Sequence, residues 1–521
     1  MTLLWSSHMG LPSPCLPDKE DCRRVPRSGV RRILSRLDAT DAAKLSFHRF
    51  GHAQSITLSY RPVSDSLESY TDTIMHIALT RTLPVLAAGL FAACAVHAQQ
   101  APATITEQRS VGAFNAIELS GPFEVAVRTE GRAGVALSGE RAQLDEIEVF
   151  VRDATLVVRP LARSGFHFDF GKRRQSVTVN IGAPQLASLR MAGSGDVTLD
   201  GISGERFTLA VAGPGDLRAS GAVRELTLSA SGSGDADLRR VRATNVDLTL
   251  SGPGDVRLAN IGNDLRARLS GSGDLEAHGL RLARLDAQMS GPGNARLAGS
   301  SRQIQARVTG SGDLDACELA GETVTTLQSG PGNACIGGPI AKLDSQITGS
   351  GDLQLPAVQA REAVLRMKGP GNANLGGKIG KLQAELGGSG ELEGDALRVT
   401  RALVTSNGPG DVVLGMVDDT LEAHLSGSGK LSAAIEGKRL LLNANGPGGA
   451  QVRGRVALVR ARMSGSGTFD GHDLNAERAD IAVSGPGNAK VNVTGETAGR
   501  GAPDAGQLLV VDRNGRRHAP E

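Results

Sequence analysis

The chain of 521 residues has few aromatic side chains. Phe, Trp and Tyr make up 3% of it, and Trp5 is the single tryptophan. Aromatic rings supply much of the buried area in ordinary cores and line many small-molecule pockets. Their scarcity argues against a conventional aromatic core and a deep ligand pocket, so Leu, Val, Ile and Ala must fill the interior.

The chain also has almost no net charge. The formal charge is +2, and residues 1–98 hold 11 Lys/Arg against 8 Asp/Glu, which leaves 46 against 47 in residues 99–521. Proteins that bind nucleic acids carry a basic stripe, often with interleaved aromatic residues. We therefore expect no nucleic-acid partner, and near-neutrality gives no support to charge-driven binding at a membrane surface.

An apolar run from Leu83 to Val96 is too short to span a membrane comfortably. It lies in residues 75–98, which begin with a start-like Met75, carry a basic Arg81 and end in the small-residue site Val96-His97-Ala98. These are the parts of a secretory signal peptide. We predict export, with the periplasm, the outer-membrane surface and the medium as the alternatives.

Two further questions about this region stay open. Residues 1–74 are either a mis-annotated extension, with translation starting at Met75, or a disordered arm rich in Arg, Ser and Pro. Phe91-Ala92-Ala93-Cys94 resembles a lipobox, which would place a lipid anchor at Cys94, although Phe91 stands where Leu is preferred.

Glycine is abundant, with 68 residues, and many of them lie in a recurring phrase, G-[S/P]-G, here called the tag, which is followed by Asp or Asn in most of its copies. Sixteen tags follow one another in steps of about 19 or 20 residues, and their middle residue alternates between Ser and Pro throughout. Their second glycines are Gly195, Gly215, Gly234, Gly254, Gly273, Gly293, Gly312, Gly332, Gly351, Gly371, Gly390, Gly410, Gly429, Gly448, Gly467 and Gly487. Self-similarity at this period, in eight pairs of about 39 residues, predicts a solenoid.

Side chains between the tags alternate in polarity. Val246, Leu248 and Leu250 share one face, whereas Asp247 and Thr249 take the other. A period of two predicts strands rather than helices.

The tag has the composition of a tight turn. A type II turn favours Pro at its second position and Gly with a positive φ at its third, and Asp or Asn can then bond locally to the turn backbone. The residues we assign to such structural turns are Gly193, Gly195, Gly213, Pro214, Gly215, Gly252, Pro253, Gly254, Gly271 and Gly273.

Two accounts explain the alternation of Ser and Pro. If one coil is a single tag-to-tag unit of about 20 residues, each Pro ring stacks between two small Ser side chains. If one coil is a pair of units, about 39 residues in all, Ser turns line one edge and Pro turns line the opposite one. We favour the first, because two strands and two turns fill the shorter coil with little left over.

Cleavage after Ala98 leaves only Cys317 and Cys335 of the five cysteines, which excludes a disulfide framework. They lie five and three residues past the second Gly of their tags. On neighbouring strands, this offset separates the Cα atoms by about 8 Å, beyond the bridgeable ~7 Å. We therefore expect no bridge between them, although an oxidising periplasm would permit one.

The start of the exported part resembles a known family. The segment SVGAFNAIELSGPFEVAVRTEG at residues 110–131, the segment DEIEVFVRDATLVVRP after it and the G-S-G tags resemble the putative auto-transporter adhesins with a head GIN domain. The resemblance covers roughly residues 104–495. It implies a right-handed parallel β-helix, similar to pectin-lyase-like solenoids, and a role in adhesion at bacterial surfaces.

We therefore predict an all-β solenoid of about sixteen rungs. An irregular β region at residues 104–190 precedes the tagged solenoid at 191–495, and a polar tail at 496–521 follows it. The irregular region includes the segment RSGFHFDFGKRR at residues 163–174. It is either a binding loop presenting Phe166, His167, Phe168 and Asp169, or a cap over the end of the solenoid.

The sequence shows no catalytic, cofactor or metal motif in the structural context that it would need. A column of Asp residues after the tags could bind Ca²⁺, but turn propensity already explains Asp and Asn there, so we expect no metal. His278 and His424 are isolated and outward-facing, and we interpret them as solvated polar residues.

The function we predict is a non-enzymatic, adhesin-like binding protein that uses long solenoid faces to hold a glycan or a protein. The alternatives are a polysaccharide-acting β-helix lyase or hydrolase and a purely structural envelope component. Homo-oligomerisation stays open.

Overall fold

The computed structural model describes residues 104–161 and 177–494, and beyond these only the strands Leu45–Phe50, Ala53–Leu58, Thr497–Gly501, Leu508–Asp512 and Arg517–His518. The chain divides into two units, Met1–Val96 and His97–Glu521. In the first, β1 (Leu45–Phe50) and β2 (Ala53–Leu58) form an antiparallel pair. The predicted signal peptide, its cleavage site and Cys94 lie outside the described residues.

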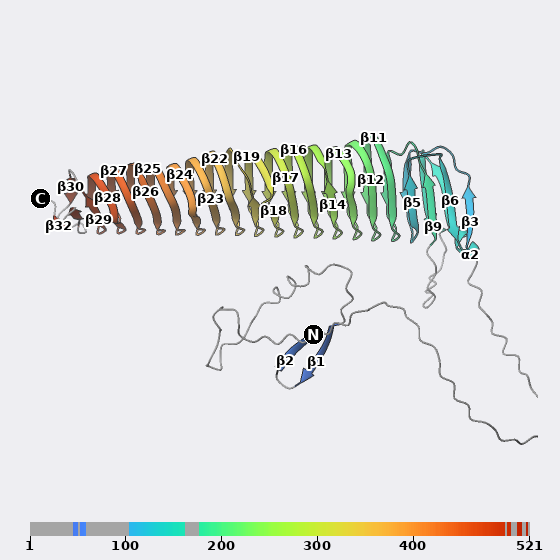
Figure 1. The fold of residues 1–521 in the computed structure, drawn as a ribbon, viewed down its shortest axis with the longest axis horizontal. Helices are drawn as coiled ribbons and strands as arrows, with labels where there is room; N and C mark the ends of the chain where they lie inside the picture. The colour runs from blue at the N-terminus through green and yellow to red at the C-terminus, as the bar shows by residue number, and fades with distance from the viewer. Residues whose placement is uncertain are drawn as a thin grey trace, which may run out of the picture. The chain divides into compact units, whose positions relative to one another are not determined.

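The second unit is a stack of parallel coils with about 15 turns, and Figure 1 shows them lying one beside the next. The predicted all-β solenoid is thereby confirmed. The strands of the tagged coils are β11 (Val197–Val211), β12 (Leu217–Ala230), β13 (Ala236–Leu250), β14 (Val256–Ala259), β15 (Ile261–Leu269), β16 (Leu275–Met289), β17 (Ala295–Val308), β18 (Leu314–Ala316), β19 (Leu319–Gln328), β20 (Ala334–Ile336), β21 (Lys342–Ile347), β22 (Leu353–Met367), β23 (Ala373–Leu386), β24 (Leu392–Ser406), β25 (Val412–Leu425), β26 (Leu431–Ala444), β27 (Ala450–Met463), β28 (Thr468–Val483) and β29 (Asn488–Val493).

One coil is one tag-to-tag unit. Val197 is the register partner of Leu217, and Leu217 is the partner of Ala236, so each strand pairs with the equivalent strand of the very next unit. The first account of the alternation is confirmed, because a coil made of two units would place partners twice as far apart. Along the edge of the stack, Pro214 therefore lies between Ser194 and Ser233.

The predicted inward residues form the core. Val246, Leu248 and Leu250 are at most 3% exposed, and the same pattern recurs in coil after coil. Among the buried residues that the structure describes, the aromatic ones are Phe123, Phe207 and Phe469. Stacked aliphatic columns thus replace the aromatic packing that the composition excludes.

The tag glycines have a different role from the one predicted. No glycine of the sixteen tags from Gly193 to Gly487 has a φ in the positive region, so the expected type II geometry at Gly195, Gly215, Gly254 and Gly273 is wrong. The cause of the glycine requirement is the neighbouring coil. A Cβ built on Gly215 would lie 2.2 Å from the carbonyl oxygen of Gly195, and one on Gly213 would lie 2.0 Å from that of Gly193.

This close approach is accompanied by hydrogen bonds between tags. The Gly215 N–H donates to the Gly193 carbonyl at 3.3 Å, and the Gly254 N–H donates to the Gly232 carbonyl at 3.2 Å. The backbone of the turns is therefore paired from coil to coil, as the strands are. The Gly252 N–H likewise donates to the Ala230 carbonyl at 3.2 Å, and the Gly271 N–H donates to the Leu250 carbonyl at 3.3 Å. Pro253, the remaining position predicted as a structural turn, lies in the same edge and has no N–H to donate.

Consecutive coils differ slightly in length, and the difference is absorbed at the corner that follows the first half of each coil. Register shifts occur there between Leu199 and Ile202 and between Ala277 and Leu280. Glycines with positive φ stand at these corners, for example Gly221 at 138° and Gly299 at 137°, which suits a residue without a Cβ. β26 and β27 lie in coils of equal length and pair without a register shift, whereas β25 and β26, also in coils of equal length, show two shifts that cancel each other.

The parallel stack extends N-terminally beyond the first tag. β4 (Ala116–Leu119) pairs in parallel with β10 (Ser188–Met191), and β5 (Glu124–Arg128) pairs in parallel with β11. Between β4 and β5, Ser120-Gly121-Pro122-Phe123 occupies the tag position, since a Cβ on Gly193 would meet the Gly121 carbonyl oxygen at 2.1 Å. The SGPF phrase is thus an additional tag in which Phe123 replaces the second glycine.

Antiparallel strands cover this end of the stack. β6 pairs antiparallel with β3 and β9, and β7 pairs antiparallel with β8, so the last parallel edge is not left open. In the described part of the chain, no helix has the length and apolarity needed to cross a membrane. The elements here are β3 (Ile105–Arg109), β4 (Ala116–Leu119), β5 (Glu124–Arg128), β6 (Gly134–Gly139), α2 (Arg141–Leu144), β7 (Ile147–Arg152), β8 (Thr155–Pro160), β9 (Thr178–Gly182) and β10 (Ser188–Met191).

The steric role of the tag glycines is testable with Gly254→Ala. The new Cβ would lie 2.2 Å from the Gly234 carbonyl oxygen, which forces neighbouring coils apart. We expect a loss of about 1–3 kcal/mol in the free energy of unfolding, the usual cost of overpacking, measured by urea unfolding with circular dichroism. Gly262→Ala is the matched control, because its nearest neighbour would be the Ala243 carbonyl oxygen at 3.8 Å. Equal stability of the two variants would contradict the steric explanation.

Candidate functional site

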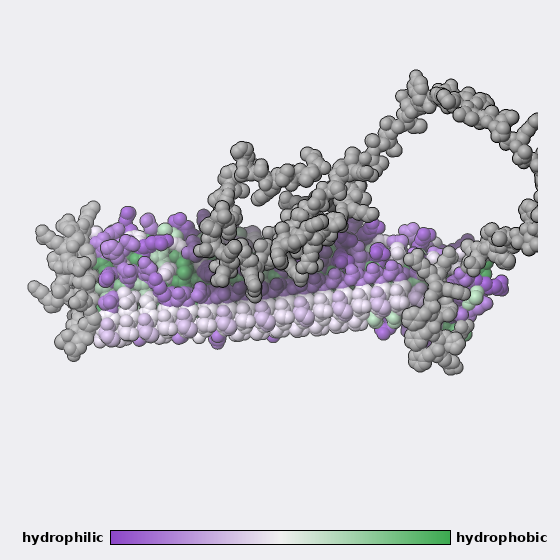
Figure 2. Space-filling model, turned by 90° about the horizontal axis from the view of Figure 1, so that it is seen from below, coloured by the Kyte–Doolittle hydropathy of each residue, from purple (hydrophilic) through white to green (hydrophobic). Residues whose placement is uncertain are grey.

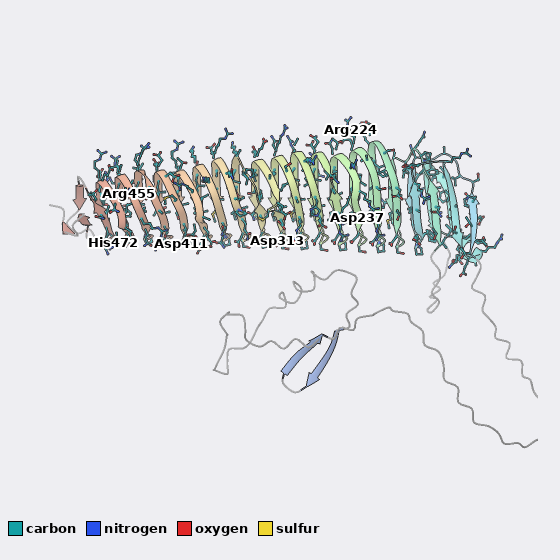
Figure 3. The ribbon with its side chains drawn as sticks, viewed as in Figure 1. Arg224, Asp237, Asp313, Asp411, Arg455 and His472 are labelled. Atoms are coloured by element: carbon teal, nitrogen blue, oxygen red, sulfur yellow. A yellow bond between two sulfur atoms is a disulfide. The ribbon has the colours of Figure 1, made fainter. Side chains whose placement is uncertain are left out.

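A column of Asp and Asn side chains follows the tags along one edge of the stack. Figure 3 places Asp313 and Asp411 at this edge and Arg224 at the opposite one. Each of these side chains from Asp196 to Asn372, and Asp411 after them, accepts a hydrogen bond from the backbone of the next coil. The Asn333 N–H donates to Asp313 Oδ1 at 2.8 Å, and the Asp352 N–H donates to Asn333 Oδ1 at 2.9 Å.

This tag ladder runs almost without interruption. It joins Asp196, Asp216, Asp235, Asp255, Asp274, Asn294, Asp313, Asn333, Asp352, Asn372 and Glu391 in succession, and it continues from Asp411 to Lys430. The predicted local bond within one turn is therefore wrong, because the partner lies one coil away. The carboxylates stabilise stacking, and no group of three or more His, Cys, Asp or Glu in the described residues is arranged to hold a metal ion.

The tag edge itself is made of small residues. In Figure 2 it forms a pale band of intermediate hydropathy along the stack, next to strongly hydrophilic surface. Gly, Ser and Pro offer few side-chain groups for recognition. The surfaces with chemical variety are those formed by outward side chains of the strands.

On these strand faces, charges alternate in sign from coil to coil. In the first half of the coils, Arg218, Asp237, Arg257, Glu276, Arg296 and Asp315 are consecutive register partners. Arg296 pairs with Asp315 at 3.1 Å, and Arg257 approaches Glu276 at 3.9 Å. Opposite charges on directly facing positions stabilise a sheet, and like charges destabilise it.

The ion pairs lower the pKa of several carboxyl groups. A hydrogen bond from Arg239 lowers the pKa of Asp237 to about 2. A hydrogen bond from His278 lowers the pKa of Glu276, and one from Arg462 lowers that of Asp480. These carboxylates stay ionised in neutral solution, whereas a general acid in glycoside hydrolysis needs a raised pKa.

His278 and His424 are outward and partly exposed, as predicted. His278 Nε2 lies 2.7 Å from Glu276 Oε1, and His424 Nε2 lies 3.1 Å from Glu422 Oε1. The Asn443 amide lies 3.1 Å from His424 Nδ1. Both imidazoles are therefore members of surface pairs, and each has a carboxylate two residues earlier on its own strand.

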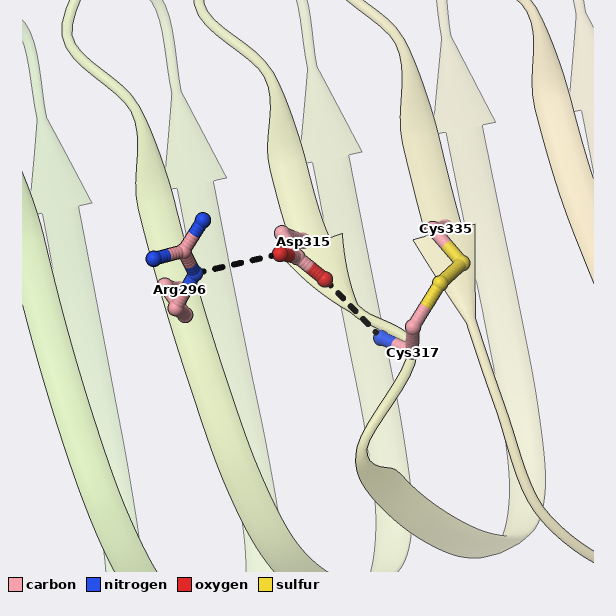
Figure 4. Close-up of a disulfide and its surroundings, with 4 residues drawn as sticks. All are labelled: Arg296, Asp315, Cys317 and Cys335. Carbon is pink, nitrogen blue, oxygen red and sulfur yellow. Dashed lines mark hydrogen bonds and ion pairs between the residues drawn. A yellow bond between two sulfur atoms is a disulfide. The ribbon is translucent and has the colours of Figure 1, made fainter. Parts of the chain in front are cut away.

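Cys317 and Cys335 form a disulfide, so the expectation of no bridge is wrong. Their Cα atoms are 5.1 Å apart. The predicted offset is correct, since Asp315 rather than Cys317 is the register partner of Cys335. However, β18 ends at Ala316, and Cys317 lies in the turn that follows, where its N–H donates to Asp315 Oδ1 at 3.3 Å. Figure 4 shows the chain curling back toward Cys335 at this point.

The bridge lies where the coils are most irregular. Short strands β18 and β20 replace the continuous strands of other coils, and the core nearby contains polar side chains. Thr326 and Ser345 are buried and their hydroxyls are 2.6 Å apart, and buried Gln328 donates to the Asp352 carbonyl at 2.9 Å. A covalent link between consecutive coils thus coincides with weaker backbone pairing.

The strand faces contain two hollows toward the C-terminal half. The cationic groove has a volume of about 610 Å³ and is lined by Gln359, Arg361, Lys378, Arg398, Thr400 and Asp418, among others. The acidic hollow has about 390 Å³ and is lined by Asp395, Asp470, Asp473 and Arg453, among others. Neither hollow was predicted from the sequence. The available indication was Gly-Gly-Lys-Ile-Gly at residues 376–380, a group of glycines outside any tag.

The predicted binding loop lies outside the described residues, and so do its members Phe166, His167, Phe168 and Asp169. The predicted site residues that are described are the tag glycines and prolines. The structure brings them together in one edge whose role is stacking. The groups able to bind a ligand are instead the strand-face charges and the two hollows.

The sequence matches the family described as putative auto-transporter adhesin, head GIN domain, in four overlapping stretches, residues 113–279, 248–355, 336–431 and 415–502. The matches run across the N-terminal cap and nearly all of the tagged coils. No protein with a curated description matches the chain.

Several solved structures are similar. A putative adhesin from Bacteroides fragilis NCTC 9343 is 16% identical over 64% of this chain and 98% of its own, with a TM-score of 0.19. A putative adhesin from Parabacteroides distasonis ATCC 8503 is 14% identical over 67% and 97%, with a TM-score of 0.27. A putative lipid binding protein from the same organism is 13% identical over 70% and 96%, with a TM-score of 0.20. At such TM-scores these similarities carry no argument about the site.

The tag ladder predicts different outcomes for two substitutions of one residue. Asp313→Ala removes the acceptor of the Asn333 N–H and should cost about 0.5–1.5 kcal/mol of unfolding free energy, the net value of a hydrogen bond. Asp313→Asn keeps an acceptor and should cost less. Urea unfolding with and without CaCl₂ measures both. A stabilisation by Ca²⁺ that Asp313→Asn abolishes would contradict a purely structural ladder.

The disulfide should contribute measurably to stability. Closing an 18-residue separation in the unfolded chain is worth about 3 kcal/mol in the chain-entropy model. We expect urea unfolding to begin at lower concentration after reduction and in Cys317→Ser with Cys335→Ser. The double variant should be insensitive to reductant, which controls for other effects of the reagent. Alkylation of Cys317 and Cys335 in the native oxidised protein, detected by mass spectrometry, would contradict the bridge.

Proposed function

Because this chain belongs to the family of putative auto-transporter adhesins with a head GIN domain, we propose that it is an exported, non-enzymatic protein that binds ligands at the cell surface or in the periplasm. The observation that carries this proposal is the long strand face of the solenoid. There, polar and charged side chains recur on each coil at a spacing of about 4.8 Å.

Such a surface suits adhesion by multivalency. Equivalent positions on successive coils present a row of groups, so a long partner can make many weak contacts at once. The strand faces are polar, and Leu161 is the one exposed large hydrophobic residue among those described. The proposed contacts are therefore hydrogen bonds and ion pairs to a hydrated partner, such as a glycan or a polar protein surface.

Two observations support export. Residues 75–98 have the composition of a signal peptide. The Cys317–Cys335 disulfide is the kind of bond that forms and persists outside the reducing cytosol. A binding role rather than catalysis is supported by Asp237, Glu276 and Asp480, whose lowered pKa values keep them ionised.

The proposal is tested by expressing the full chain in a bacterial host and following it through cell fractionation and N-terminal sequencing. We expect a mature protein that begins at Gln99, in the envelope or the medium. Cells that export it should adhere to glycan- or protein-coated surfaces better than cells that express the same chain without residues 75–98.

Retention of the intact chain in the cytosol would contradict export. Release of new reducing ends or unsaturated sugars from a glycan panel, abolished by a single Asp→Asn change such as Asp473→Asn in the acidic hollow, would contradict a non-enzymatic role. Asp313→Asn in the tag ladder is the matched control for that substitution, because its carboxylate has a structural partner.

A further inference from the structure

The cationic groove breaks the charge alternation seen on other parts of the strand faces. Lys378 on β23 is the register partner of Arg398 on β24, and Lys381 is the partner of Arg401 on the same two strands. Like charges on facing positions repel. Elsewhere the pattern is opposite in sign, as in Asp247, Arg266 and Asp286, which are partners on three consecutive coils.

The carboxylates at this place do not compensate for the cations. Lys381 pairs with Glu362 at 3.4 Å, and Arg398 pairs with Asp418 at 2.9 Å. Arg361, Lys378 and Arg401 are exposed and have no ion pair with any described residue. Five cations on three consecutive coils thus face two paired carboxylates, which leaves a local excess of positive charge on a nearly neutral protein.

The floor of the groove lacks side chains for a steric reason. A Cβ on Gly377 would lie 2.2 Å from the Val358 carbonyl oxygen, and Gly377 has a φ of +106°. A Cβ on Gly380 would lie 2.7 Å from the Arg361 carbonyl oxygen. Gly377 and Gly380 of β23 therefore contribute no side chain to the hollow, which Arg361 and Arg398 line from the coils on its two sides.

We propose that this groove binds the anionic groups of an acidic polysaccharide, a ligand class that rests on the proposed adhesin-like function. Carboxylate or sulfate groups of the polysaccharide would supply acid partners for Arg361 and Lys378, which line the groove and have no ion pair with any described residue. Gln359 and Thr400, which also line the groove, offer hydrogen bonds to sugar hydroxyls. The volume of about 610 Å³ is in the range of small-ligand sites and fits a short stretch of a chain.

The observations favour this ligand over other polyanions. Proteins that hold single-stranded nucleic acids stack the bases on aromatic side chains, and none lines this groove. A membrane surface is flat and engages a broad basic patch, whereas these cations surround a recess. An acidic glycan chain has separate charged groups that enter a recess one at a time.

The test compares two double variants of the full chain. Arg361→Gln with Lys378→Gln removes two cations that have no acid partner, and it leaves the Arg398–Asp418 pair intact. Arg242→Gln with Arg281→Gln is the matched control, because these exposed arginines lie on the same side of the coils, outside the groove, and also lack an ion pair with any residue that the structure describes. Circular dichroism and urea unfolding establish that both fold.

Binding to polygalacturonate, dextran sulfate and neutral dextran is measured by isothermal titration calorimetry or biolayer interferometry. We expect the wild-type protein to bind the charged polymers and not dextran, more weakly as NaCl rises. The groove variant should bind about tenfold more weakly, and the control variant should bind as the wild type does. The ratio between polygalacturonate and dextran sulfate distinguishes carboxylate from sulfate recognition.

Three results would overturn the proposal: no binding of either charged polymer, equal binding by the groove variant and the wild type, or tighter binding to vesicles of anionic lipid or to DNA. Cell adherence is measured with the same variants. If adherence persists while the groove variant binds polymers normally, the groove assignment fails and the adhesin-like function stands. If adherence is absent but polymer binding depends on the groove, the adhesin-like function fails and the groove assignment stands.

Discussion

The close approach of consecutive coils at the tag edge is the constraint on which the rest of the structure depends. At Gly193, Gly213 and the equivalent tag glycines, the backbones of two consecutive coils approach so closely that no Cβ fits between them. The tags can then exchange hydrogen bonds from coil to coil, as the strands do. The same spacing aligns the inward aliphatic columns and brings each Asp or Asn of the tag ladder within reach of the next N–H. One steric condition therefore fixes the hydrogen bonding, the core and the surface together.

The sequence predicted what depends on period and polarity. Tag spacing and alternation around Val246, Leu248 and Leu250 indicated the solenoid, its coil length and its core. Prediction from the sequence failed for contacts that depend on the neighbouring coil. The tag glycines suggested a turn conformation, but glycine is required there because a carbonyl oxygen of the neighbouring coil leaves no room for a Cβ. Asp313 suggested a local bond, but its partner is Asn333. Cys317 was placed on a strand, yet a single turn after Ala316 moved it next to Cys335. Contacts of this kind are set by three-dimensional register.

The candidate site was less predictable than the fold for a related reason. The sequence drew attention to the most regular residues, the tags, and the structure assigns these to stacking. The proposed binding groove lies at an exception to the pattern, where Lys378 faces Arg398 and glycines stand outside the tags. Such exceptions are inconspicuous in a single sequence, since they become meaningful only after the partner of each residue is known. In a repetitive protein, the regular residues build the scaffold and the irregular ones distinguish one place on it from another.

The alternation of coil length bears on how such an array grows. A longer coil fits against a shorter one through a register shift at the corner. One longer and one shorter coil together therefore form the smallest unit after which the arrangement of the corners repeats. Duplication or loss of a whole pair leaves every remaining neighbour unchanged, whereas gain of a single coil would place two similar corners together. Near the C-terminus, β26 and β27 belong to coils of equal length and meet without a shift. There the tags follow one another at equal steps, so the two-coil rhythm of the array is interrupted in this segment.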